Sequence, residues 1–143
     1  TYEDVLLETE NVYAKMSEDT LLVIVDTHRK DYVESPEIVD KTNKLVIIDH
    51  HRKSTDAIED ALLTFQEVYA SSASELVTEM LQYVDEKIAL PLVEAECLYA
   101  GILTDTKNFM YKTGVRTFEA AATPSDTRRA GKNAAAIINK LMF

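Results

Sequence analysis

The sequence predicts an α/β fold in which a parallel sheet is flanked by helices. Short runs of aliphatic and β-branched residues alternate with segments of helical periodicity, and the first two of these runs end at aspartate and histidine. The chain has 143 residues, of which 46% are hydrophobic and 28% are charged. This is an ordinary globular composition, so the chain is expected to be one domain or a piece of one.

Three strands are expected. Residues 21–25 read Leu-Leu-Val-Ile-Val, a continuous apolar run that is typical of a strand buried on both faces. Residues 44–48 form a second such run, and a third strand is expected at about residues 62–68. The other periodic segments are expected to be helices, at about residues 2–16, 35–41, 71–84, 93–103, 117–122 and 134–142.

Charge and glycine content exclude several kinds of binding site. The formal net charge of −10 disfavours long nucleic acid and direct contact with an anionic membrane unless cations intervene. The longest apolar run is far shorter than the roughly 20 residues that span a membrane. The chain has only three glycines, and no glycine-rich phosphate loop is present. Handling of phosphates would therefore require metal ions.

Candidate site residues follow the first two strands. Each of these strands ends in an aspartate, Asp26 or Asp49, and a right-handed parallel unit places both strand ends at one edge of the sheet, where ligands bind. All three histidines follow within two residues of these acids: His28, His50 and His51. Carboxylate and imidazole suit manganese, magnesium or zinc. The alternative is that the aspartates cap helices or bind a ribose, and that the histidines are ordinary loop residues.

Further polar residues lie in the second half of the chain. Asp105 stands where an apolar helical stretch breaks into a polar loop, and Lys107 and Asn108 follow it closely enough to contact a substrate. Arg116 could contact a phosphate, since its planar fork matches phosphate oxygens, or it could be a surface arginine. Ser72 could direct a helix N-terminus at a phosphate, although simple helix capping is favoured.

Three other residues are assigned structural places. His28 is treated as a loop histidine without a required role. Cys97, the single cysteine, cannot form an internal disulfide, which fits a reducing compartment, and its place on an apolar helix face predicts a core position. Tyr69 is expected to be a packing residue.

The segment Ile48-Asp49-His50-His51-Arg52 resembles the DHH-family phosphoesterases. Val25-Asp26-Thr27 is similar to the second motif of that family, and Gly101-Ile102-Leu103-Thr104-Asp105-Thr106 to its fourth. Several segments, among them Leu21 to His28 and Ala70 to Glu79, resemble more narrowly the GdpP/YybT-type cyclic di-AMP phosphodiesterases of Gram-positive bacteria.

The resemblance implies a two-metal site, usually with manganese and with magnesium or another divalent cation as the alternative. Asp26 would bridge both ions, and His50 and Asp105 would complete the shell of the second ion. Asp49 would orient a neighbouring histidine, and His51 would donate to the phosphate. A water activated by the two metals would open cyclic di-AMP to linear pApA.

The resemblance also indicates what this chain lacks. The family's first motif, a His-x-x-x-Asp-x-Asp type segment, is absent, and its substrate-gripping partner domain would follow Phe143. Residues 1–143 are therefore expected to be a partial DHH phosphoesterase domain, inactive or nearly so alone, from the cytoplasmic part of a membrane-anchored bacterial protein. Loss of the first-motif strand would expose an apolar sheet edge at residues 21–25, which predicts strand pairing or a homodimer.

Two other functions remain open. The chain could belong to another DHH phosphoesterase, either a pyrophosphatase or a hydrolase of short oligoribonucleotides. It could also be a non-catalytic nucleotide-binding module. The presence of the first motif in the full-length protein would distinguish an enzyme from a binding module.

Overall fold

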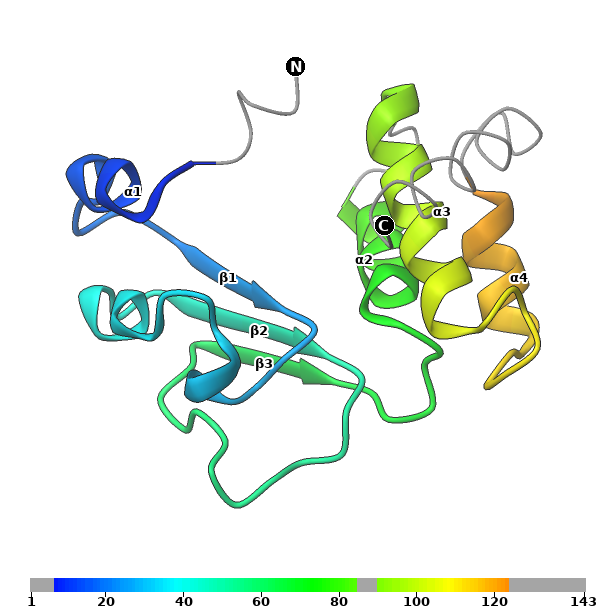
Figure 1. Cartoon of the computed structure of the whole chain (residues 1–143), viewed down its shortest axis with the longest axis horizontal. Helices are drawn as coiled ribbons and strands as arrows, with labels where there is room; N and C mark the ends of the chain where they lie inside the picture. The colour runs from blue at the N-terminus through cyan, green and yellow to red at the C-terminus, as the bar shows by residue number, and fades with distance from the viewer. Residues whose placement is uncertain (1–6, 85–89, 124–143) are drawn as a thin grey trace.

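The computed structural model describes residues 7–84 and 90–123. Its centre is a sheet of three parallel strands in the order β1-β2-β3 (Figure 1), formed by β1 (Leu22–Val25), β2 (Leu45–Asp49) and β3 (Leu63–Gln66). The predicted parallel α/β architecture is confirmed. All three strands run in the same direction, so their carboxyl ends share one edge of the sheet.

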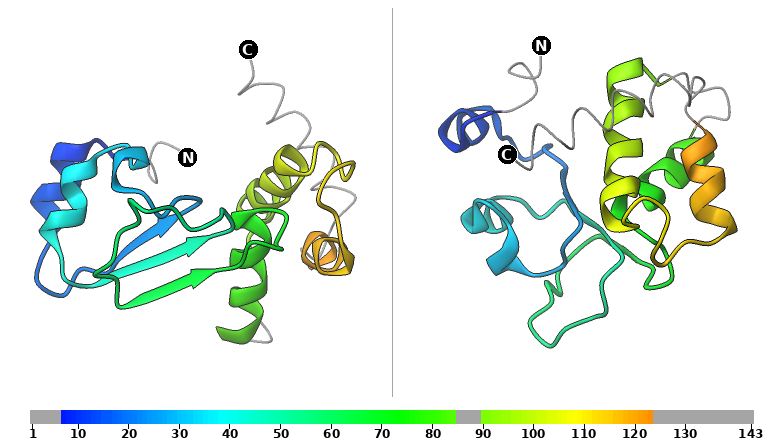
Figure 2. Two further views of the ribbon diagram at one scale, coloured as in Figure 1. Left: turned by 90° about the horizontal axis from the view of Figure 1, so that it is seen from below. Right: turned by 45° about the vertical axis from the view of Figure 1, so that its right-hand side comes forward.

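The helices gather at the two ends of the strands. Figure 2 shows α2, α3 and α4 beyond the carboxyl ends, whereas α1 and the 3-10 helix η3 lie toward the amino ends. The bounds are α1 Thr9–Lys15, η2 Lys30–Tyr32, η3 Pro36–Lys41, α2 Ala73–Val84, α3 Leu92–Asp105 and α4 Val115–Ala122. The segment expected to form a helix after Ser35 is thus a 3-10 helix, and the helix expected at residues 134–142 lies outside the described residues. No described helix has the length and apolar character that crossing a bilayer requires.

The sheet has one apolar cluster on each side. Ile24, Leu45 and Ile47 form the core of the first, together with partly buried residues of η3 and of the loop before β3. Ile48 and Leu76 belong to the second, which joins the sheet to α2. Burial of these side chains is the main contribution to stability, at roughly 25 cal/mol for each Å² of apolar surface removed from water.

The expectation that residues 21–25 are buried on both faces is wrong. Ile24 is 6% exposed, but its neighbours Val23 and Val25 are 46% and 49% exposed. The physical reason is that β1 is an edge strand. On the face of the sheet that carries Val23 and Val25, the second cluster of described residues covers β2 and β3 but does not extend over β1. Among the described residues, only those on the Ile24 side of β1 form a covering cluster.

Two smaller expectations also need correction. Cys97 is exposed rather than buried, because the buried small residues of α3, Ala95 and Ala100, lie on other sides of that helix. Tyr69 is not a packing residue, since it is 88% exposed in the turn between β3 and α2.

Candidate metal centre

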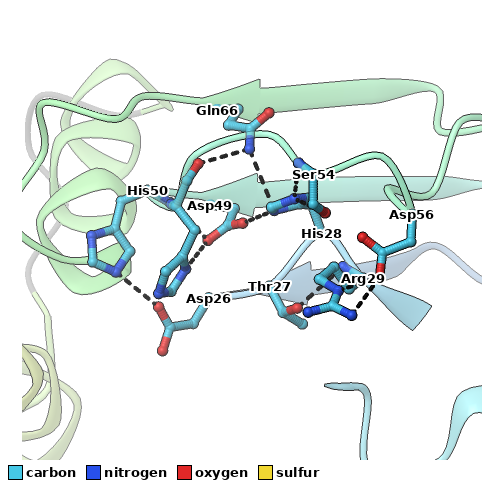
Figure 3. Close-up of polar contacts among 10 residues, drawn as sticks. Asp26, Thr27, His28, Arg29, Asp49, His50, Ser54, Asp56 and Gln66 are labelled. Carbon is cyan, nitrogen blue, oxygen red and sulfur yellow. Dashed lines mark hydrogen bonds and ion pairs between the residues drawn. The ribbon is translucent and has the colours of Figure 1, made fainter. Parts of the chain in front are cut away.

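Asp26 and His50 meet at the carboxyl ends of β1 and β2. The strand register pairs Val25 with Ile48, and the Asp26 amide donates to the Ile48 carbonyl at 3.0 Å, so the residue after each strand faces the same edge. His50 Nε2 lies 3.2 Å from Asp26 Oδ1 (Figure 3). Asp26 has a φ of 66°, in the left-handed region that aspartate tolerates better than most residues. This backbone conformation is the kind of local strain that often accompanies a functional site.

Asp105, the last residue of α3, approaches the same imidazole from a distant part of the chain. Its Oδ2 lies 3.7 Å from His50 Nε2. Burial raises the pKa of Asp105, and the nearby Asp26 carboxylate raises it further, against the opposing effect of His50. The hydrogen bond with Asp26 raises the pKa of His50, in spite of burial and with help from Asp105. The two acids therefore create a field that favours a bound cation.

The opposite nitrogen of His50 supports coordination through Nε2. His50 Nδ1 is buried and has no hydrogen-bond partner among the described residues. The backbone of Ala70 is close enough to raise the pKa of His50, but it does not reach hydrogen-bond geometry. Binding of a metal at Nε2 places the ring proton on Nδ1, where this backbone group is available as an acceptor.

His51 lies close enough to Asp26 and His50 to be a further metal ligand. One ligand atom from each of Asp26, His50 and His51 lies within 4.8 Å of the others, and the two imidazole rings have centroids 4.4 Å apart. Imidazole and carboxylate donors from separate segments suit a borderline or hard divalent ion. The residues present therefore fit a centre for a divalent metal.

Asp49 lies behind these residues and is fully buried. Its Oδ1 accepts hydrogen bonds from the His50 amide at 2.8 Å and from His51 Nδ1 at 2.7 Å, while its Oδ2 accepts one from His28 Nδ1. Burial alone would raise the pKa of Asp49, but the hydrogen bonds from His28 and His51 outweigh burial and lower it. Asp49 is thus an ionised carboxylate whose two oxygens hold two different histidines.

His28 lies in a loop as expected, but it is buried and makes specific contacts that no spacing in the sequence reveals. It is only 4% exposed and contacts both Asp49 and Ser54. Ser54 lies in the irregular loop between β2 and β3, whose path has no sequence periodicity. The only available signal was the position of His28 two residues after Asp26.

The predicted substrate-binding residues are spread around this centre. Lys107 and Asn108 follow Asp105 with φ values of 49° and 58°, and both are exposed. Ser72 is buried, and its Oγ accepts the Glu75 amide at 3.0 Å, which is a helix cap. Arg116 forms two hydrogen bonds to Glu79, at 2.8 and 2.6 Å.

A pocket of about 530 Å³ opens beside Asp26 and His51. Its lining includes Arg52, which the sequence suggested as a source of positive potential, and also Arg29 and Tyr32, which the sequence did not single out. The Arg29 guanidinium lies 4.3 Å from the centre of the Tyr32 ring. The pocket thus combines Asp26 and His51 with basic and aromatic groups.

Comparisons with known proteins show which family this chain belongs to. Residues 2–102 match the DHH family, N-terminal domain. The chain is 49% identical over 106 residues to the cyclic-di-AMP phosphodiesterase GdpP of Bacillus subtilis, covering 74% of this chain and 16% of that protein. It is 42% identical over 107 residues to the cyclic-di-AMP phosphodiesterase PdeA of Listeria monocytogenes, covering 75% of this chain and 16% of that protein.

A solved structure shares the fold. The exopolyphosphatase-related protein of Bacteroides fragilis superposes with a TM-score of 0.64 at 20% identity, over 87% of this chain and 39% of its own. The chain thus spans only a small part of the curated relatives it matches, 16% of each of the two described above. The family match covers well over half of the chain, and the chain belongs to the DHH family through that family's N-terminal domain.

Proposed function

We propose that this chain contributes part of the metal centre of a phosphodiesterase that hydrolyses cyclic di-AMP to linear pApA. The observation that carries the proposal is the convergence of Asp26 and Asp105 on one nitrogen of His50, at 3.2 and 3.7 Å. The substrate is inferred from relatives that are named for cyclic di-AMP hydrolysis and are 49% and 42% identical to this chain.

Asp26, His50 and Asp105 would hold divalent cations, with manganese as the proposed metal. When bound, such ions neutralise charge on a phosphate and lower the pKa of a bound water. A cation is needed here for a simple electrostatic reason: two carboxylates beside an anionic phosphodiester would otherwise repel it.

The remaining residues would orient the substrate. Asp49 accepts a hydrogen bond from His51 Nδ1, so His51 Nε2 would donate to a phosphate oxygen in the imidazolium form, in which both ring nitrogens carry protons. Lys107 and Asn108, next to Asp105, are proposed to contact the substrate beyond the phosphate. The pocket beside Asp26 has the size and the basic and aromatic lining that suit a nucleotide unit.

Arg116 and Ser72 have weaker support as substrate-binding residues. Arg116 must exchange its two hydrogen bonds to Glu79 for a phosphate before it can contribute. Ser72 Oγ is occupied by the amide of Glu75, so its contribution would come through the amino end of α2 rather than its hydroxyl.

The catalytic site is proposed to need sequence beyond residues 1–143. The chain contains the second, third and fourth family motifs, and the first motif and the partner domain would complete the site in a larger protein with a membrane anchor and a cytoplasmic catalytic part. The exposed edge of β1 is consistent with this, because an edge strand readily accepts another strand. For this chain in isolation, the available strand donor is a second copy.

The test is manganese-dependent hydrolysis of cyclic di-AMP, measured as formation of pApA. The chain alone is expected to show little or no turnover, and a polypeptide extended at both ends to include the missing parts is expected to be active. In the extended protein, Asp105→Ala and His50→Ala should abolish turnover, while Glu59→Gln, at an exposed acid in the loop before β3, should not.

Other outcomes would favour the alternative functions. Hydrolysis of short oligoribonucleotides or pyrophosphate, without hydrolysis of cyclic di-AMP, would replace the proposed substrate. Tight binding of cyclic di-AMP by the extended protein without turnover at saturating manganese would indicate a nucleotide-binding module.

A further inference from the structure

His28 connects three separate parts of the chain through its ring and backbone. Its Nδ1 contacts Asp49 Oδ2 at the end of β2, and its Nε2 lies 2.9 Å from Ser54 Oγ in the following loop (Figure 3). Its backbone carbonyl accepts the Ile58 amide at 2.8 Å. The ring is therefore buried in a fixed orientation between β1, β2 and the β2–β3 loop.

The contacts of His28 determine which ring nitrogen carries the proton. The Ser54 backbone amide, which can only donate, points at His28 Nε2 at 3.0 Å, so Nε2 is an acceptor. The proton is consequently on Nδ1, which donates to Asp49. Gln66 Nε2 lies 3.3 Å from the same Nδ1, but it has a better acceptor in the His51 carbonyl at 2.8 Å.

Asp49 transmits this orientation to the metal centre. With His28 on Oδ2, the carboxylate cannot rotate without losing the bond from His51 Nδ1 to Oδ1 at 2.7 Å. The same Oδ1 accepts the backbone amide of His50 at 2.8 Å. Removal of the His28 donor would leave one oxygen of a fully buried carboxylate unpaired, which favours a rotated arrangement.

We propose that His28 is a positioning residue: its Nδ1–H fixes the Asp49 carboxylate, which in turn fixes the tautomer and ring orientation of His51 and the backbone of His50. The expected effect of His28 on metal binding rests on the proposed function. The effect of His28 on His51 is a property of the hydrogen-bond chain and does not require a metal.

A purely structural histidine is the competing explanation, and two substitutions separate it from a positioning role. His28→Asn places an amide N–H near the position of the ring Nδ1, so it can still donate to Asp49. His28→Gln is closer to histidine in volume but places its amide near the position of Nε2. If His28 only fills space, glutamine should be the better replacement; if it positions Asp49, asparagine should be.

The primary measurement is the tautomer of His51, read from imidazole nitrogen chemical shifts at mildly alkaline pH without metal. Wild type and His28→Asn should hold the proton of His51 on Nδ1, and His28→Gln should show a mixture of tautomers. The same chemical shifts give the tautomer of His28 in the wild type, and this test does not depend on whether the variants fold. Finding the proton of His28 on Nε2, or an unchanged His51 in His28→Gln, would overturn the proposal.

Manganese affinity of the same chain, measured by titration calorimetry, is the second readout. His28→Gln should bind Mn²⁺ about 10-fold or more weakly than wild type, and His28→Asn should recover most of that loss. If wild type binds no Mn²⁺, the proposed metal centre fails while the tautomer test of His28 still stands. If wild type binds and both variants bind equally well, the positioning role at the metal centre is wrong.

Discussion

Asp26 Oδ1 and His50 Nε2 lie 3.2 Å apart at the carboxyl ends of two neighbouring parallel strands. The contact follows from the register of β1 and β2, since each residue leaves its strand at the shared edge of the sheet. Asp105 adds a second carboxylate at 3.7 Å from the same nitrogen. One imidazole thus faces two acids, an arrangement that a bound cation would stabilise.

Asp105→Asn should have little effect on the stability of the metal-free chain but should remove the stabilisation by Mn²⁺. Removal of one of two neighbouring negative charges should leave the metal-free protein equally stable or more stable by less than about 1 kcal/mol, since solvent screens this partly exposed site. The gain in melting temperature on addition of Mn²⁺ should disappear. In wild type that gain corresponds to about 2.7 kcal/mol when Mn²⁺ exceeds its Kd about 100-fold.

Differential scanning fluorimetry with and without Mn²⁺ measures both effects. Glu59→Gln is the matched control, because it removes an acid from an exposed loop and should keep the full response. An Asp105→Asn protein that retains the full shift would show that Asp105 is not a ligand.

The lowered pKa of Asp49 predicts that the folded chain loses stability in acid. Its pKa in the folded chain lies below the ordinary value of 3.8, so ionised Asp49 favours the folded state. This contribution is complete above the ordinary value and is lost as the pH falls through the lower, folded-state pKa. Urea unfolding at several acidic pH values should show this loss in wild type.

Asp49→Asn should be less stable than wild type near neutral pH by about 1–3 kcal/mol, because the amide cannot accept all of the hydrogen bonds that the carboxylate accepts. The deficit should shrink as the pH falls through the acidic range. A deficit that stays constant with pH would mean that the charge of Asp49 does not contribute.

Gly101 of α3 lies close against Ser74 of α2. A Cβ at this position would lie 2.1 Å from Ser74 Oγ and 3.0 Å from Ser74 Cβ. Gly101→Ala should therefore cost about 1–3 kcal/mol, although alanine normally favours a helix over glycine. Ser74→Ala combined with Gly101→Ala should recover part of this loss, and additive effects in chemical denaturation would rule out the contact.

Val23→Pro tests strand pairing through the edge of β1. The amide of Leu22 donates to the carbonyl of Lys44, just before β2, at 2.9 Å, and the amide of Asp26 donates to Ile48 in β2 at 3.0 Å. By alternation, the amide of Val23 points away from the sheet. Val23→Pro should remove self-association and preserve the fold, whereas Ile24→Pro should disrupt the ladder between β1 and β2. Sedimentation velocity measures the association, and a monomeric wild type would contradict homodimer formation by this chain.

The sheet and half of the candidate site could be predicted because they depend on local pattern and one topological rule. Continuous apolar runs located β1 and β2, and the shared edge of parallel strands brought Asp26 toward His50. The approach of Asp105 does not follow from periodicity. It depends on how α3 packs on α2, and only the resemblance to the DHH family indicated it.

The remaining features depend on contacts that have no sequence pattern. The partner of His28 is Ser54, in an irregular loop, so its burial could not be read from spacing. The exposure of Val23 depends on which strand is at the edge of the sheet. Cys97 lies in a helix with apolar residues on several sides, so its pattern does not define a single buried face.

The most direct test of the metal centre is anomalous diffraction at the manganese edge from crystals of this chain grown with Mn²⁺. A manganese peak bounded by Asp26, His50 and Asp105, absent in His50→Ala, is the predicted result. No peak at saturating Mn²⁺, or a peak only at other acids, would contradict the account.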